Sequence, residues 1–378
     1  MTEASADAPA FPEPEFIERH HATLHYGASL GKRRRALGVY DADGALVPLT
    51  DIRTGILSTA PPKERPEAGK VEVHRGPALF AGLGHPHFGH AITCSLGRLW
   101  ATERLGARAT LLFAPRRFGW GVGAIEPLAR FFGVGNPMRM IRGPIRVRRF
   151  FAATDLFGER YEGRAAPLFR DWVKRRTPNL AETRAGAKLY VTRGAIAKPH
   201  GRFACEPVLE ENLAANGFEI WSPEAFTLEE QAAKLQSAET LVFSEGSAVH
   251  FFAFLKRPEQ NVFVVQRRSN LAPLLSQNAT AFDDRPVTFV NAIERQWYPP
   301  TNKDNHSVAE LNFDVLRDVF VDGGAIAPDG PWRAPSGEEL SASLSYSKTK
   351  RIPLISREEF DRRRKAGELL SFRPEDFV

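Results

Sequence analysis

The sequence has 378 residues, 43% of them hydrophobic, which is enough to form the cores of two domains of ordinary size. Lys and Arg exceed Asp and Glu by 51 to 45, a balance that favours anionic partners. Only two cysteines occur, Cys94 and Cys205, so no disulfide framework is expected and a reducing, cytoplasmic compartment fits. The sequence shows no signal-peptide pattern and no apolar run of about 18 residues, so we expect neither secretion nor a membrane span.

The first half predicts a tail followed by an α/β domain. Residues 1–20 lack hydrophobic periodicity, and we expect a mobile tail there. Residues 21–180 then alternate short apolar runs with turn signals, including a hairpin or meander over residues 32–60. Strands are expected at 70–73, 78–81 and 109–113, and helices at 125–132 and 166–176. Residues 179–186 are predicted to link this domain to the next.

The stretch from His85 to Trp100 predicts a helix that follows a strand and a Gly-x-Gly turn. If this helix begins near His87, its core-facing stripe consists of Phe88, Ile92, Leu96 and Leu99. The opposite face then carries polar and small residues: His87, His90, Cys94, Gly97 and Ala101. Such a face could line a cleft.

His87, His90 and Cys94 also have side chains of the metal-ligand type. No carboxylate and no second cysteine in this stretch completes a site, so we predict neither a metal nor a cofactor. A histidine that only forms structural hydrogen bonds at a helix N-terminus is the alternative interpretation of His90.

The second half predicts a parallel sheet, because strands and helices alternate from Lys188 to Arg267. Strands are expected at 188–193, 218–221, 240–243, 261–266 and 287–290, and helices at 206–216, 227–237, 251–255 and 308–320. Thr227 and Glu230 form a capping box at the start of the second helix. Ligands of such a sheet bind at the carboxyl ends of its strands.

Residues suited to a diphosphate lie at those strand ends. Gly246, Ser247 and Ala248 form a strand-to-helix turn, where free amides and the helix dipole favour an anion. Arg193 ends the first strand, Arg202 lies in the next loop, and guanidinium groups bind phosphate bidentately. A surface salt bridge of these arginines with Glu206 is the alternative interpretation.

Several motifs of this second half, in the same order, resemble the C-terminal half of glycosyltransferase family 61. They are Tyr190 to Arg193, Arg202, Glu206, Asn216 to Phe218, Pro223-Glu224, Leu228, Gln231, Ala238 and Glu245 to His250. The family's N-terminal motif is matched by His90, Arg98, Leu99 and Trp100. Cys94 stands where an acidic residue is expected, and Glu245 where many members carry histidine.

The resemblance implies a GT-B-like α/β fold, in which two Rossmann-type α/β domains face a cleft. It implies an acceptor-side domain at 21–180, a nucleotide-sugar-binding domain at 187–300, and a C-terminal helix and extension at 301–378. The implied activity is that of an inverting glycosyltransferase. Such an enzyme moves a sugar from a nucleoside-diphosphate donor to a surface polysaccharide, such as a capsule, or to a lipid-linked or related glycan.

Site residues follow from the helix phase, the strand ends and the resemblance together. The catalytic candidates are His90 as general base and Glu245, with His87 as a further alternative base. The donor-binding candidates are Arg193, Arg202, Glu206, Gly246, Ser247 and Ala248, and the cleft-lining candidates are His87, Cys94, Arg98 and His250.

Two further classes of function are weighed against the transferase. A noncatalytic nucleotide- or glycan-binding protein of the same fold is the alternative, because Cys94 replaces the expected acid. Nucleic-acid binding is not expected, because the aromatic residues are not interleaved with Lys and Arg. Peripheral contact with an anionic membrane through Arg362 to Lys365 is weighed against a charged helix face.

Overall fold

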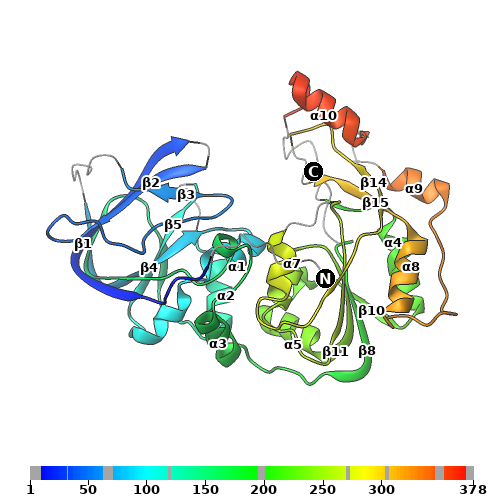
Figure 1. Ribbon diagram of the computed structural model, residues 1–378, viewed down its shortest axis with the longest axis horizontal. Coiled ribbons are helices and arrows are strands. Elements are labelled where there is room, and N and C mark those ends of the chain that lie inside the picture. Colours follow the sequence, from blue (N-terminus) through cyan, green and yellow to red (C-terminus); the bar gives the residue numbers. More distant parts are fainter. Residues whose placement is uncertain are drawn as a thin grey trace. The chain divides into compact units, whose positions relative to one another are not determined.

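The computed structural model describes residues 10–31, 33–62, 71–117, 121–194, 201–269, 273–302, 306–344 and 353–371 (Figure 1). The chain divides into two compact units, with unit 1 formed by residues 1–179, 250–256 and 273–284. Unit 2 consists of residues 180–249, 257–272 and 285–378, so the C-terminal extension belongs to it. The boundary after Asn179 falls within the predicted linker. No helix of the described residues is long and apolar enough to cross a membrane.

Unit 1 is built on a seven-stranded sheet with the order β3-β2-β1-β7-β4-β5-β6. Its strands are β1 (Phe16–Gly31), β2 (Arg34–Tyr40), β3 (Ser58–Ala60), β4 (Glu72–Gly84), β5 (Thr110–Pro115), β6 (Met138–Met140) and β7 (Ile145–Ala153). Strands β7, β4, β5 and β6 run parallel to one another, whereas β1 pairs antiparallel with both β7 and β2. The sheet is therefore mixed, and the all-parallel Rossmann pattern expected for this domain is not found.

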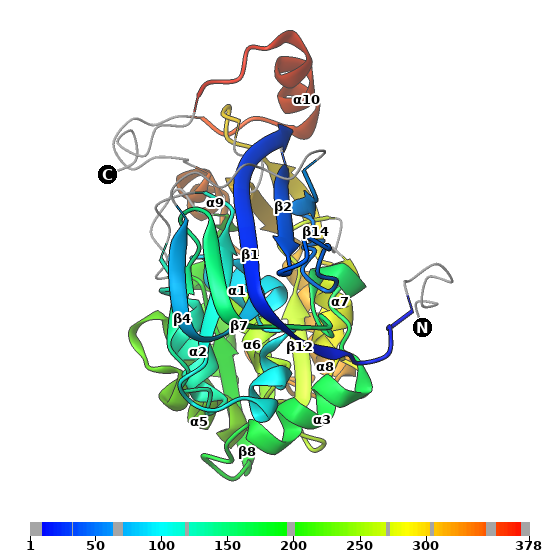
Figure 2. The same cartoon turned by 90° about the vertical axis from the view of Figure 1, so that its left-hand side faces the viewer.

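Strand β1 corrects the predicted tail, because residues 16–20 are part of the sheet (Figure 2). Phe16 pairs with Ala153 and Leu24 with Ile145, so the strand follows β7 over its first half. The polar residues around Arg19 and His20 lack the apolar–polar alternation by which a strand is predicted from sequence. Its ladder hydrogen bonds come from a partner strand that lies far away in the sequence.

The helical segments of unit 1 are α1 (Phe88–Ser95), η1 (Leu99–Arg104), α2 (Ile125–Phe131), η2 (Glu159–Tyr161), α3 (Pro167–Arg176) and α7 (Pro273–Ala279). Helix α1 is shorter than predicted, and all residues from 91 to 102 are buried. The prediction of a cleft-facing side with Cys94, Gly97 and Ala101 is therefore wrong. A Cβ atom at Gly97 would lie 2.0 Å from Asp155 Oδ1, so the chain around residues 155–157 covers this face.

Unit 2 contains a five-stranded parallel sheet with the order β10-β8-β11-β12-β13, which confirms the predicted parallel sheet. Its strands are β8 (Arg184–Val191), β10 (Phe218–Trp221), β11 (Ala238–Ser244), β12 (Asn261–Val265) and β13 (Thr288–Val290). Numbered along the chain, this order is 2-1-3-4-5. In such a doubly wound sheet the ligand crevice lies at the switch point, here between β8 and β11.

The remaining elements of unit 2 are a small sheet, in the order β14-β15-β9, and several helical segments. These elements are β9 (Arg202–Phe203), β14 (Ile293–Trp297), β15 (Val308–Leu311), α4 (Glu206–Ala215), η3 (Pro223–Ala225), α5 (Leu228–Ser237), α6 (Ser247–Phe252), α8 (Phe313–Asp322), α9 (Gly337–Ser343) and α10 (Arg357–Ala366). The last three residues of α6 belong to unit 1. The capping box of Thr227 and Glu230 is confirmed. The predicted helix at 308–320 is wrong in its first turn, because Asn312 caps α8 and the preceding residues form β15.

Candidate active site

Four side chains of unit 1 meet where α1 and η2 come together: His90, Thr93, Cys94 and Glu159. We call them the His90 cluster. His90 Nδ1 lies 3.1 Å from Glu159 Oε1, and the Thr93 hydroxyl donates to the same oxygen over 3.5 Å. The Cys94 thiol donates to the same carboxylate, and the backbone N–H of Gly55 donates to Oε2 over 2.8 Å. Glu159 is thus the acceptor at the centre of the cluster.

Burial and charge set the protonation of the cluster. Burial raises the pKa of Glu159, but the hydrogen bonds from His90 and Cys94 outweigh it and hold the pKa below its usual range. Burial and the charge of Glu159 raise the pKa of the Cys94 thiol well above its usual value. The Glu159 side chain is 7% exposed and that of His90 is 40% exposed. A buried carboxylate thus orients an accessible imidazole, the arrangement of a general base and its orienting partner.

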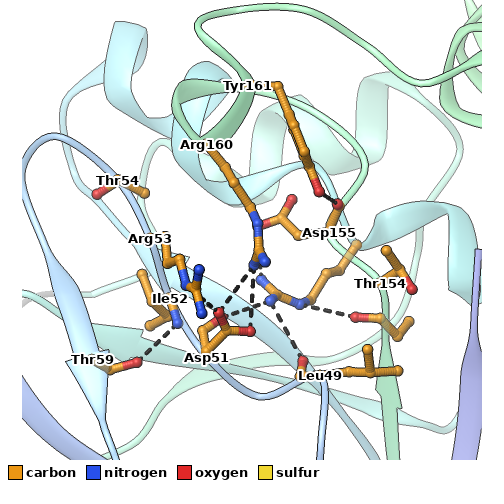
Figure 3. Close-up of polar contacts among 12 residues, drawn as sticks. Leu49, Asp51, Ile52, Arg53, Thr54, Thr59, Thr154, Asp155, Arg160 and Tyr161 are labelled. Carbon is orange, nitrogen blue, oxygen red and sulfur yellow. Dashed lines mark hydrogen bonds and ion pairs between the residues drawn. The ribbon is translucent and has the colours of Figure 1, made fainter. Parts of the chain in front are cut away.

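A second network of polar contacts includes Arg160 of η2 (Figure 3). Arg98, only 2% exposed, donates to Asp155 Oδ2 over 2.9 Å and to the Asp51 carbonyl oxygen over 2.7 Å. Arg160 Nη1 in turn donates to the Asp51 carboxylate over 3.2 Å. Because Arg160 is the neighbour of Glu159 in η2, this network anchors the central carboxylate. Arg98, predicted to line a cleft, is a buried structural residue.

A cavity of about 550 Å³ adjoins Glu159 in unit 1. Its lining consists of Glu159, Arg160, Tyr161, Arg53, Thr54, Ser58, Ala10 and Pro12. The hydroxyl and guanidinium groups of this lining suit a polar, hydroxyl-rich ligand.

A second group of charged residues lies at or beside the carboxyl ends of β8, β11 and β12 in unit 2. We call Arg193, Arg267, Arg268, Glu206 and Glu245 the arginine edge. Arg193 follows β8, Glu245 follows β11, and the other two arginines follow β12. The switch point of the sheet therefore carries three guanidinium groups and two carboxylates.

Glu206 ties the two central strands together at this edge. Its Oε1 accepts hydrogen bonds from Tyr190 Oη at 3.2 Å, Thr192 Oγ1 at 3.1 Å, Arg193 N at 3.0 Å and Ser244 Oγ at 2.8 Å. Since the residue is buried and this oxygen is saturated, Glu206 positions the end of β8. Its geometry does not fit direct contact with a donor.

Glu245 is likewise an anchor, and the structure does not fit the catalytic role predicted for it. Its side chain is 1% exposed. It accepts from the backbone N–H groups of Arg267 at 2.8 Å and Arg268 at 3.2 Å, and from Arg268 Nε at 2.7 Å. A carboxylate engaged in this way is not a proton acceptor for a substrate.

Arg193 of this edge has a hydrogen-bonding group that no described residue satisfies. Its Nε is buried and has no hydrogen-bond partner among the described residues. Burial lowers the pKa of Arg193, and it lowers that of Arg267 to about 10, so both remain cationic at neutral pH. A Cβ atom at Gly246 would lie 2.6 Å from Arg193 Nη1. The glycine of the predicted phosphate turn thus makes room for Arg193.

The remaining predicted site residues lie elsewhere. Arg202 is on β9 and donates to the Ser343 carbonyl oxygen over 2.7 Å. His250 Nδ1 lies 2.8 Å from Asn278 Oδ1 in unit 1. His87 is exposed and stands at the N-cap of α1, where its backbone N–H donates to His85 Nδ1 over 3.1 Å. Ser247 and Ala248 open α6, which has only six residues.

Sequence reasoning missed four residues of these sites, namely Thr93, Glu159, Arg267 and Arg268. Arg267 and Arg268 directly follow a predicted strand, so the rule that selected Arg193 could have found them. Glu159 is 69 positions from His90, and no local pattern links the two residues. Only the tertiary structure brings a carboxylate to the place where Cys94 replaces the expected acid.

A comparison with protein-family models gives one match, described as Glycosyltransferase 61, over residues 88–262. The matched segment runs from the start of α1 into β12 and includes the His90 cluster together with Arg193, Glu206 and Glu245. A search among curated proteins finds no match to the chain. Residues 88–262, a little under half of the chain, are thus similar to glycosyltransferase family 61, and this similarity indicates glycosyltransferase activity.

Proposed function

We propose that the protein is an inverting glycosyltransferase that uses a nucleoside-diphosphate sugar as its donor. The observation that carries this proposal is Arg193, whose buried Nε has no partner among the described residues at the switch point of a parallel sheet. Switch points of such sheets bind nucleotides, and guanidinium groups bind phosphate through charge-assisted hydrogen bonds. Arg267 and Arg268 add positive charge beside it. The leaving diphosphate would be stabilised at this edge.

The His90 cluster supplies the base that inversion requires. The N–H at His90 Nδ1 donates a hydrogen bond to Glu159, so Nε2 is the ring nitrogen that can take the proton of an acceptor hydroxyl. The deprotonated oxygen attacks the anomeric carbon while the bond from that carbon to the diphosphate oxygen breaks. The proton ends on His90 and the negative charge on the leaving diphosphate.

The cavity beside Glu159 is the proposed acceptor site, because its hydroxyl and guanidinium groups can bind a glycan. The proposed acceptor is a surface polysaccharide, such as a capsule, or a lipid-linked glycan, at the cytoplasmic side of a membrane. A GT-B enzyme would use both units in one reaction. The alternative of a noncatalytic binding protein rests on Cys94, which replaces the expected acidic residue. Glu159 supplies a carboxylate to the same cluster, which weakens this alternative.

Calorimetry with nucleoside diphosphates and the matching free nucleosides tests the donor site. We expect Arg193→Ala to weaken diphosphate binding by about tenfold or more, because one charge-assisted hydrogen-bonding group is lost. Nucleoside binding should change little. Arg202→Ala is the matched control, since Arg202 is tied to Ser343. Equal losses for nucleoside and diphosphate, or no diphosphate binding by the unmodified protein, would contradict the proposal.

A further inference from the structure

Three members of the His90 cluster have the chemistry and spacing of metal ligands. One ligand atom from each of His90, Cys94 and Glu159 lies within 4.8 Å of the other two. The sequence alone predicts no metal, because no carboxylate stands near the histidine and the cysteine. Glu159 of η2 supplies that carboxylate from a distant part of the chain.

The geometry of the backbone favours a shared ion. His90 and Cys94 are four residues apart on α1, so their side chains lie on the same face of the helix, one turn apart. Tetrahedral zinc with ligands at 2.0–2.3 Å separates its ligand atoms by about 3.3–3.7 Å. His90 Nδ1 and Glu159 Oε1 are 3.1 Å apart, a little less than this separation. Small side-chain rotations would bring Cys94 Sγ, the third ligand atom, within bonding distance of the same ion.

The chemistry of these three ligands indicates which metal would bind. A thiolate is a soft ligand that binds zinc but not magnesium or calcium, and imidazole and carboxylate are both common zinc ligands. Outer contacts that orient a ligand are also present, because Gly55 N–H holds the second oxygen of Glu159 over 2.8 Å and Thr93 lies against the first. His90, the more exposed of the ligands, gives the ion a route from solvent.

We propose that His90, Cys94 and Glu159 form a zinc-binding site with a fourth position open to water or to another oxygen ligand. On binding, Zn²⁺ forms a bond to Cys94 Sγ and the thiol proton leaves to solvent. His90 coordinates through Nδ1, and its single ring proton moves from Nδ1 to Nε2. This site needs no nucleotide or sugar, so it does not depend on the proposed transferase function.

Cobalt titration of the full-length protein tests the site, because Co²⁺ replaces Zn²⁺ and gives a charge-transfer absorption when a thiolate binds it. We expect this absorption in the unmodified protein and in Cys205→Ser, which removes the other buried cysteine. Cys94→Ser should lack it. Glu159→Gln should weaken Co²⁺ binding by at least about tenfold, since even outer partners of metal ligands contribute 10- to 100-fold. Added Zn²⁺ should abolish the absorption by displacing Co²⁺.

Absence of the absorption in the unmodified protein overturns the proposal, as does its persistence in Cys94→Ser or its loss only in Cys205→Ser. If Cys94→Ser does not fold, His90→Gln keeps the proposal testable, because it leaves the buried thiol in place. Zn²⁺ should raise the melting temperature of the unmodified protein. It should leave that of His90→Gln unchanged, and an equal rise in both would overturn the proposal.

Discussion

Glu159 is the residue that changes the chemistry expected of this chain. It accepts hydrogen bonds from His90, Thr93, Cys94 and the Gly55 backbone, and it is buried while His90 is accessible. The cluster therefore contains a carboxylate even though position 94 is a cysteine. The proposed base and its orienting partner are His90 and Glu159.

The first prediction concerns His90. We expect His90→Ala to lower turnover by about 10²- to 10⁴-fold, the range of a lost general base, with donor affinity little changed. Glu159→Gln should also lower turnover, because the imidazole loses its charged orienting partner. His87→Ala is the control, since His87 is exposed and outside the cluster. Steady-state kinetics with saturating donor measure the effect, and normal turnover by His90→Ala would show that the base is misassigned.

The second prediction couples the proposed zinc site to turnover. Zinc bound at His90 Nδ1 leaves only an N–H on the other ring nitrogen, so the imidazole cannot accept a proton. We expect Zn²⁺ to inhibit transfer, a chelator to restore it, and Cys94→Ser to lose at least about tenfold in zinc sensitivity. Transfer rates of the unmodified protein and of Cys94→Ser, measured over a range of zinc concentrations, test this prediction. Activation by zinc would mean that the metal, and not His90, prepares the acceptor.

At the scale of elements, strand ends and short turns position the site residues. Strands β8, β11 and β12 end side by side and carry the arginine edge. Hydrogen bonds link Arg98 to Asp155 and Asp51, and Asp51 to Arg160, and they hold η2 in place. Each site thus depends on a neighbouring element for its geometry.

The third prediction concerns the turn between β11 and α6. Gly246→Val should displace the Arg193 guanidinium, because even a Cβ atom there would lie 2.6 Å from Nη1. Diphosphate affinity should fall about as far as in Arg193→Ala. The double variant should show little further loss, because both changes remove the same interaction. Calorimetry measures this, with Ser247→Ala as control, and additive losses would mean that the turn binds phosphate itself.

The fourth prediction concerns the stability of the loop that contains Asp51. Burial raises the pKa of Asp51, but the positive charges of Arg160, Arg98 and Arg53 outweigh it, so the pKa lies below its usual range. A carboxyl with a lowered folded-state pKa stabilises the fold above its unfolded pKa, near 3.9, and loses this contribution as the pH falls through the folded value.

We therefore expect the loss of thermal stability between about pH 5 and pH 2 to be shallower in Asp51→Asn than in the unmodified protein. Asp43→Asn, at an exposed turn, is the control. Melting temperatures measured across this range give the slopes. Equal slopes for the unmodified protein and Asp51→Asn would contradict the role of Asp51.

At the scale of the whole molecule, the two sites belong to different compact units. The His90 cluster lies in unit 1 and the arginine edge in unit 2. The family match at residues 88–262 includes residues of both sites. Base chemistry and donor binding should therefore be separable by mutation.

The fifth prediction follows from this separation. His90→Ala should alter the maximal rate and Arg193→Ala the donor affinity, with additive free-energy changes in the double variant, as expected for residues without shared partners. Zinc binding should also survive Arg193→Ala. Kinetics of the two single variants and the double variant measure the additivity. A strong departure from additivity would mean that one residue supports the fold of the other site.

The parallel sheet of unit 2, its capping box and the position of Arg193 at a strand end could be predicted from the amino-acid sequence. These features depend on periodicity and local hydrogen bonds, which a few neighbouring residues specify. Local signals were insufficient for β1, whose polar first half is held by pairing with β7. They also failed for β15, which pairs with β14 and β9.

The roles of the charged residues could not be predicted from local sequence patterns. Glu206, Glu245 and Arg98 look like site residues in the sequence, but burial and saturated hydrogen bonds make them supports. Glu159 carries no local signal, yet it completes the cluster around His90 because η2 packs against α1. The physical reason is that the function of a charged group depends on its solvent access and its partners, which segments far apart in the sequence supply.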